Sequence, residues 1–169
     1  MIENPVSGER IVIRASGEQT DGRLLSFDLY LPGGRHVPAG HVHPEQVERF
    51  TLLSGRLCFR MGGLKWRRMV LTQPGQTITI PAGTAHWFGN PGTAVAHARV
   101  DVEPALQMEA LLVASEGLAA SGSGWAPLAR VIGLVLLLLQ FEREIAVPHL
   151  PRRLVSIALG PIAWLVRHP

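Results

Sequence analysis

Short apolar stretches and turn residues alternate along the N-terminal part of the chain. The pattern is clearest in residues 23–31, where Leu25, Phe27 and Leu29 alternate with Ser26 and Asp28. A period of two residues is typical of a strand with one buried face. Such stretches predict strands at residues 10–14, 23–31, 37–43, 47–53, 56–61, 64–71, 76–80, 85–89 and 94–102. Many short strands with regular glycine- and proline-containing turns predict a closed barrel or a sandwich.

The pattern changes after Pro104, where Ala, Leu, Glu and Met become frequent. These residues favour helices. Three helices are predicted, at residues 105–120, 127 to about 146, and 152 to about 167. The chain therefore divides into a β domain over residues 1–103 and a C-terminal helical extension over residues 104–169.

The helical extension is unusually apolar. Residues 131–139 are apolar on every side, and residues 154–166 carry no charge. Both stretches are shorter than the roughly 20 residues that cross a membrane, so we expect no membrane contact, although an interfacial helix with an arginine fringe is an alternative. A helix that is apolar all round is normally buried on several sides. We expect the extension to pack on the β domain and on a second copy of the chain, as a homodimer.

Composition and charge narrow the class of protein. The 169 residues suffice for one domain with a sizeable core. The net charge is +3, and the basic residues are scattered rather than clustered into a patch, so we expect no nucleic-acid partner. The single cysteine, Cys58, excludes an intramolecular disulfide. The first residues show no signal peptide, and we expect a cytoplasmic protein.

Two stretches carry residues that bind metals. His41 and His43 are two positions apart, so on a strand both rings project from one face. Glu48 follows after a break at Pro44, and a Pro-Ala-Gly turn at 81–83 re-aims the chain before His86. Three imidazoles and a carboxylate suit one divalent transition metal, and this set leaves Fe, Mn, Ni, Cu and Zn open.

The residues near these ligands predict a pocket, with alternatives left open. If the bend at Pro44 shifts the strand phase, Gln46 replaces Glu48 as the oxygen ligand. Alternation places three apolar side chains in the interior: Phe50, Leu52 and Phe88. His36 is a candidate for the pocket mouth and His97 for an acid–base group, although either histidine can equally be an ordinary solvated or buried residue. The interior is otherwise poor in acid–base groups.

The two stretches resemble the signature motifs of the cupin superfamily. The second motif, G-x5-P-x-G-x2-H-x3-N, is matched at every fixed position, and the first, G-x5-H-x-H-x(3,4)-E-x6-G, is matched at all but one. The matching residues are His41, His43, Glu48 and Gly55, and then Gly75, Pro81, Gly83, His86 and Asn90. The leading glycine of the first motif is displaced by one position, to Gly34. Small bacterial single-domain cupins with a helical tail are the most similar group.

The resemblance implies a mainly β, antiparallel jelly-roll barrel of the RmlC-like type, with the metal inside and the helical segment after it. Cupins include dioxygenases, isomerases, epimerases and non-catalytic binding proteins, so the fold leaves the reaction open. We expect a metal-binding protein with a small-molecule ligand or substrate. A dioxygenase-like oxidoreductase acting on a small apolar molecule is favoured over a cupin isomerase or epimerase, because the latter need an acid–base pair. A non-catalytic binding protein is the other alternative.

Overall fold

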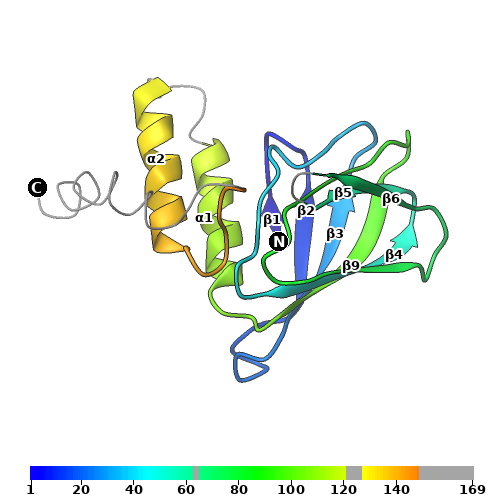
Figure 1. Ribbon diagram of the computed structural model, residues 1–169, viewed down its shortest axis with the longest axis horizontal. Helices are drawn as coiled ribbons and strands as arrows, with labels where there is room; N and C mark the ends of the chain where they lie inside the picture. Colours follow the sequence, from blue (N-terminus) through cyan, green and yellow to red (C-terminus); the bar gives the residue numbers. More distant parts are fainter. Residues whose placement is uncertain (63–64, 121–126, 149–169) are drawn as a thin grey trace, which may run out of the picture.

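Two antiparallel sheets and two helices make up the described part of the chain. The computed structural model describes residues 1–62, 65–120 and 127–148. The larger sheet has the strand order β1-β2-β3-β9-β4-β7 and the smaller one β6-β5-β8 (Figure 1). The strands are β1 (Ile2–Glu3), β2 (Arg10–Ala15), β3 (Leu25–Leu31), β4 (Val47–Ser54), β5 (Leu57–Met61), β6 (Arg67–Leu71), β7 (Thr77–Ile80), β8 (His86–Gly89) and β9 (Ala96–Glu103).

Aromatic side chains join the two sheets. Phe50 on β4 of the larger sheet packs against Phe59 and Phe88 of the smaller sheet, with ring centroids 5.0 Å apart in each pair. All three side chains are buried. The two sheets therefore pack around one core. The fold is mainly β as predicted, but the strands stay in two sheets and do not close into one continuous barrel.

The central strands β3 and β9 follow the predicted alternation. Their registered pairs Phe27–Val100 and Leu29–Ala98 are buried in the core. On the opposite face Asp28 accepts hydrogen bonds from Arg14 and Arg99, at 2.6 and 2.7 Å. The two arginines offset the cost of burying the carboxylate, so the outer face of this sheet is an ion-pair layer.

The predicted strand at 37–43 is wrong. Only isolated bridges form there, His36 with Gly89, His41 with His86 and Val42 with Ala146. Pro38 and Pro44 lack the backbone N–H that a ladder needs, which keeps this stretch from forming a continuous strand. The bounds of the other predicted strands differ from the observed bounds by up to three residues. Strand β1 was not predicted, because two residues are too short to show an alternating pattern.

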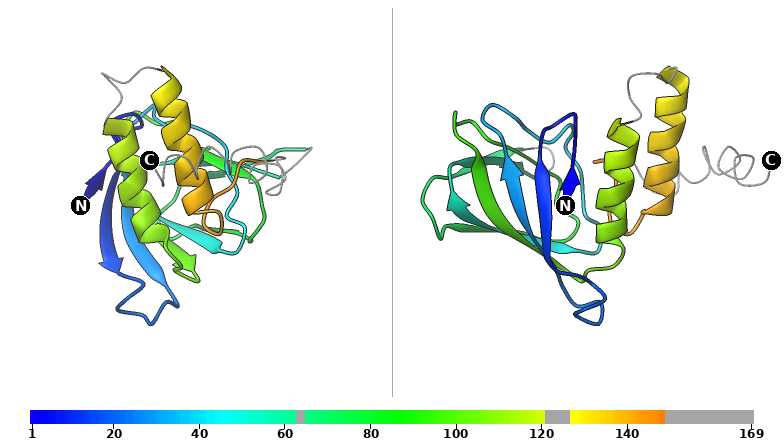
Figure 2. Two further views of the ribbon diagram at one scale, coloured as in Figure 1. Left: turned by 90° about the vertical axis from the view of Figure 1, so that its left-hand side faces the viewer. Right: turned by 180° about the vertical axis from the view of Figure 1, so that it is seen from behind.

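The helices lie side by side at one side of the sheets (Figures 1 and 2). They are α1 (Met108–Ala120) and α2 (Pro127–Gln140). The second helix ends at Gln140 rather than near Ala146, and residues 141–148 turn back toward the sheets. The predicted break at 121–124 and the predicted third helix lie outside the described residues. Within the described residues, no helix has the length and apolar character that crossing a bilayer requires.

Candidate metal centre

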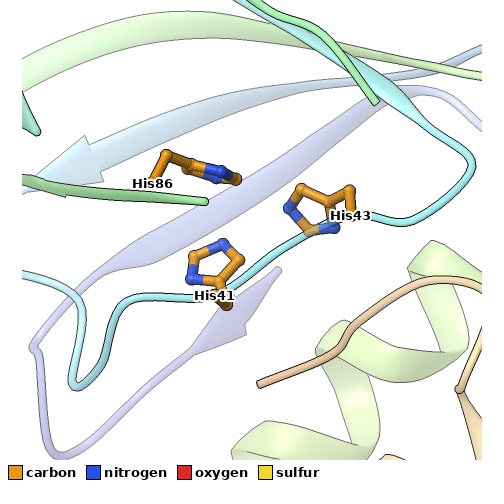
Figure 3. Close-up of side chains that lie close together, drawn as sticks. All are labelled: His41, His43 and His86. Carbon is orange, nitrogen blue, oxygen red and sulfur yellow. The ribbon is translucent and has the colours of Figure 1, made fainter. Parts of the chain in front are cut away.

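Three histidines converge from two chain segments. His41 and His86 face each other across a two-hydrogen-bond bridge, with both N···O distances 2.9 Å. His43 lies two residues further on, and its ring centroid is 4.9 Å from that of His41 and 5.2 Å from that of His86. The three imidazoles can each offer one nitrogen so that all three atoms lie within 4.8 Å of one another (Figure 3).

Backbone carbonyls orient all three rings. The Nδ1 atoms of His41 and His86 lie 3.2 and 3.1 Å from the carbonyl oxygens of Ala39 and Thr84. The Nδ1 of His43 lies against the carbonyl oxygen of Glu144. A carbonyl oxygen only accepts, so each Nδ1 must be the donor. The Nε2 atom of each neutral ring is then left with a free lone pair, which is the form of histidine that binds a metal.

Glu48 lies beside the three rings. Its Oε2 atom is 3.2 Å from His86 Nε2 and 3.6 Å from His43 Nε2. Glu48 Oε2 and His86 Nε2 are both buried, and neither has a hydrogen-bond partner among the described residues. Buried polar atoms without partners are costly. A cation among these atoms would satisfy the carboxylate and the lone pairs together, so the donor set fits a divalent transition metal.

The charges of these groups depend on one another. Burial alone would raise the pKa of the Glu48 carboxyl, but the imidazoles of His43 and His86 outweigh it and lower the pKa to about 2. Burial, and then the neighbouring His86 and His43, lower the pKa of His41 to about 3. Burial also lowers the pKa of His43. For His86 burial acts in the same direction, but the Glu48 carboxylate prevails and raises the pKa. At neutral pH this leaves a carboxylate facing neutral His41 and His43.

These pKa shifts predict acid destabilisation of the metal-free protein. Between pH 6.5 and 3 the unfolded chain binds a proton at His41 that the folded chain does not, so stability falls as the pH falls. Below pH 4.5 Glu48 acts in the same direction, because its folded pKa is also depressed. His86 has the opposite sign: its contribution is present below pH 6.5 and is lost as the pH rises through its raised pKa.

We expect the melting temperature of metal-free protein to fall between pH 7 and pH 4, and to fall less in His41→Asn. Thermal unfolding in the presence of a chelator, at matched ionic strength, measures both slopes. Equal slopes in the two proteins would show that His41 does not titrate as its surroundings imply.

The segment that follows α2, residues 141–148, is hydrogen-bonded to the loop that carries His41 and His43. Ala146 exchanges two backbone hydrogen bonds with Val42, with N···O distances of 2.9 and 3.0 Å. The buried Glu144 accepts a hydrogen bond from the N–H of Gln107 at 3.0 Å, which anchors the segment to the start of the helical extension. The hydrogen bond from the His43 ring to the Glu144 carbonyl could not be predicted from the sequence, because no local pattern links residues so far apart in the chain.

The structure separates the other predicted site residues. Gln46 is buried, and its amide donates to the carbonyls of Pro104 and Ala105 at 2.9 and 3.0 Å, so it ties β4 to the start of the helical extension. The side-chain oxygen beside the histidines is therefore that of Glu48 and not that of Gln46. His36 is exposed and lies against Trp87, with ring centroids 5.3 Å apart.

His97 lies on the outer face of the larger sheet, away from the core residues Ala96 and Ala98. Its ring stacks on Tyr30 at 4.3 Å between centroids, and its Nε2 is 3.5 Å from Asp28 Oδ1. His97 therefore belongs to the ion-pair layer around Asp28. The expectation that it serves the interior is wrong, because on β9 it has the opposite phase to the buried residues.

The apolar candidates Phe50, Leu52 and Phe88 are fully or almost fully buried. They pack into the core that joins the sheets, together with Phe59. These side chains fill space and exclude water from the core between the two sheets.

The structure explains why glycine or asparagine occupies three of the motif positions around the candidate ligands. Gly55 has a φ of 80°, and a Cβ there would lie 2.7 Å from the Cα of Ala96, so no other residue fits. Gly83, with a φ of 75°, donates its N–H to the carbonyl of His43 at 2.8 Å. Asn90 donates to the carbonyls of Leu31 and Ala94, at 2.9 and 2.8 Å. Gly83 therefore holds the loop that carries His43, whereas Gly55 and Asn90 fix neighbouring turns.

Comparison with known proteins identifies a family and a fold. A family model described as a cupin domain matches residues 27–103. This segment runs from β3 to the end of β9 and contains all four candidate ligands. No curated protein sequence shows significant similarity to the chain.

Solved structures share the fold at low sequence identity. A structure of oxalate oxidase is 19% identical, with a TM-score of 0.51, over 95% of this chain and 70% of that chain. Peruvianin-I, a cysteine peptidase from Thevetia peruviana latex, is 16% identical with a TM-score of 0.51, over 60% of this chain and 64% of that chain. An oxidase and a peptidase on one fold show that the fold does not decide the reaction.

A putative sugar phosphate isomerase from Acidithiobacillus ferrooxidans is 20% identical with a TM-score of 0.45, over 55% of this chain. The alignment spans 58% of that protein's length. At these identities the likeness shows the fold alone.

Proposed function

Because this chain belongs to the cupin superfamily, we propose that it binds one divalent transition metal through His41, His43, His86 and Glu48. The observation that carries the proposal is the common orientation of the three imidazoles. Each ring directs its Nδ1 to a backbone carbonyl, which leaves three Nε2 lone pairs for one cation. Carbonyl-oriented imidazoles are typical of metal ligands, since the hydrogen bond fixes both the tautomer and the ring plane.

The reaction proposed for this centre is the oxidation of a small organic molecule. A bound redox-active metal would supply Lewis acidity and one-electron chemistry at its open positions. The chain contributes orientation of the imidazoles, negative charge from Glu48, and exclusion of water by Phe50 and Phe88. Its fold likeness to oxalate oxidase extends over nearly the whole chain, which makes oxidation the first activity to test.

Metal content tests the proposed metal binding, and oxygen uptake tests the proposed oxidation separately. Untagged protein reconstituted with Mn(II), Fe(II), Ni(II), Cu(II) or Zn(II) is expected to hold one equivalent of at least one metal, measured by elemental analysis after gel filtration. Substoichiometric binding of all five would end the metal proposal. The manganese and iron forms are then tested for oxygen consumption with short carboxylic acids, alcohols and phenols. Full metal loading with no oxygen uptake on any of them would leave a binding protein and not an oxidase.

The proposed homodimer uses the helical extension. Val131 and Leu134 on α2 and Val113 on α1 are about half exposed, so apolar surface remains on the described helices. We expect Val131→Glu with Leu134→Glu to convert the protein to a monomer without loss of β structure. Light scattering after gel filtration gives the mass, and circular dichroism gives the β content. A wild-type protein that is already monomeric at micromolar concentration would contradict the dimer.

A further inference from the structure

A fifth ionisable side chain faces the interior that holds the histidines. Glu9 directly precedes β2, where Ile11 is buried and Arg10 is exposed. Alternation along the strand therefore turns Glu9 to the same side as Ile11, which is the core face. In the close-up, the ribbon of the N-terminal strands appears in the same field as the three imidazoles (Figure 3). Glu9 lies outside the segment that matches the family model.

The Glu9 carboxyl is only partly satisfied. Its Oε2 atom is buried and has no hydrogen-bond partner among the described residues. Ser7, itself buried, lies close enough to hydrogen-bond the side chain, and its hydroxyl also accepts from the Glu9 N–H at 3.3 Å. A buried carboxyl oxygen without a partner is costly, and such a group in a native fold normally meets a ligand, an ion or a water molecule.

Glu9 is also electrostatically coupled to the metal-binding groups. Burial raises the pKa of its carboxyl, the hydrogen bond from Ser7 lowers it, and the charge of Glu48 raises it further. The Glu48 charge therefore acts on Glu9, whose side chain also turns to the core face of the sheet. Among the described residues, no Lys, Arg or His side chain forms an ion pair with Glu9.

The charge of the candidate centre indicates what would bind there. Three neutral imidazoles, the Glu48 carboxylate and a divalent metal sum to one positive charge at the metal and its ligands, before Glu9 is counted. An anionic oxygen is therefore favoured at an open metal position. A hydroxyl group elsewhere on the same molecule suits Glu9, because a hydroxyl donates to a carboxylate and accepts from a carboxylic acid. The match thus holds for both protonation states of Glu9.

We propose that Glu9 is a ligand-binding residue of this centre, and that the bound molecule is a short hydroxycarboxylic acid whose carboxylate meets the metal and whose hydroxyl meets Glu9. This inference rests on the proposed metal site and names the class of molecule it takes. It replaces the apolar molecule expected from the sequence, because that expectation counted no polar interior group besides the ligands and the candidates His36, Gln46 and His97.

Ligand selectivity of the cobalt-loaded protein tests the proposal. The visible Co(II) absorption band reports occupancy of the metal, and the probes are 3-hydroxypropionate and propionate, which differ by one hydroxyl. In wild type, 3-hydroxypropionate is expected to bind about tenfold more tightly, as for one hydrogen bond to a charged or buried group. In Glu9→Ala the ratio of the two affinities is expected to fall to about one. Glu9→Gln keeps a donor and an acceptor and should retain part of the ratio.

The matched control is Glu3→Ala, which removes an exposed carboxylate from β1 of the same hairpin and should leave the ratio unchanged. A ratio that persists in Glu9→Ala would mean that the hydroxyl chelates the metal, and would overturn the role of Glu9. Equal binding of both probes to wild type, or binding of neither, would overturn it as well. Failure of wild type to bind Co(II) at all would overturn the metal proposal together with this one, whereas full Co(II) loading of Glu9→Ala separates the two.

Discussion

Substitution of His41 by alanine is expected to weaken metal binding by at least about 100-fold. Loss of a residue that merely orients a ligand typically costs 10–100-fold, and His41 would lose a ligand outright. His41 is only partly buried, so the fold should tolerate the change better than loss of the fully buried His86. Removing one of three imidazoles leaves a donor set that holds a divalent metal poorly.

Thermal unfolding turns this loss into a measurable shift. With free metal at 100 times the dissociation constant, wild type gains about 2.7 kcal/mol, or about 5–10 °C in melting temperature for a chain of this length. At the same metal concentration a 100-fold weaker variant gains about 0.4 kcal/mol, or about 1 °C. Differential scanning fluorimetry with and without metal gives both shifts directly.

His36→Ala is the matched control for His41→Ala. It removes an exposed histidine five positions away that lies outside the three-histidine group, and should keep the full metal-dependent shift. An unchanged shift in His41→Ala would mean that His41 is not a ligand. Equal losses in both variants would point to a general effect on the loop that carries them.

Sequence reasoning succeeded where one residue pattern has one physical cause. On β3 and β9 apolar side chains line the core face and polar side chains the opposite face, so a strict alternation of apolar residues predicts both the strand and its inward side. The histidines of the two motifs could likewise be predicted, because their spacing is local and the turn at Gly83 bonds directly to His43. Prolines broke the predicted strand at 37–43, but the bridge between His41 and His86 still brought the two motifs together.

The parts that could not be predicted depend on contacts between distant segments. Glu9 precedes a strand with a weak alternating pattern, and only the tertiary fold shows that its unpartnered oxygen is buried and that the Glu48 charge acts on it. Glu144 interrupts an apolar stretch, so in the sequence it looks like a helix-surface charge. Its burial and its carbonyl contact with His43 arise because the chain leaves the helix after Gln140.

The contact between the helical extension and His43 makes the two parts of the chain energetically linked. The Glu144 carbonyl fixes the His43 tautomer, and the backbone bridge from Ala146 to Val42 keeps the segment in place. A segment that stabilises the ligand-competent ring must itself be stabilised when the metal binds, because coupling between two sites is reciprocal. The helical extension is thus expected to influence metal affinity without supplying a ligand.

Substitution of Ala146 by proline is therefore expected to weaken metal binding by about 10–100-fold. Proline removes the N–H that donates to the Val42 carbonyl at 2.9 Å, which loosens the segment that presents the Glu144 carbonyl. Titration against a competing chromogenic chelator gives the affinity. Hydrogen exchange gives the reciprocal effect: metal should slow exchange at the amides of Val42 and Ala146 in wild type, and much less at the Val42 amide in the variant.

Val147→Pro is the control that separates the lost bond from the presence of a proline. Val147 is exposed, and its N–H donates no hydrogen bond to another described residue. A proline there favours the extended backbone that Ala146 already has in its bridge, so the metal affinity should stay within about twofold of wild type. A folded Ala146→Pro protein with wild-type affinity would show that His43 keeps its orientation without the helical extension. Equal weakening in both variants would show that any proline in this segment has the same effect, so that the bridge to Val42 has no particular role.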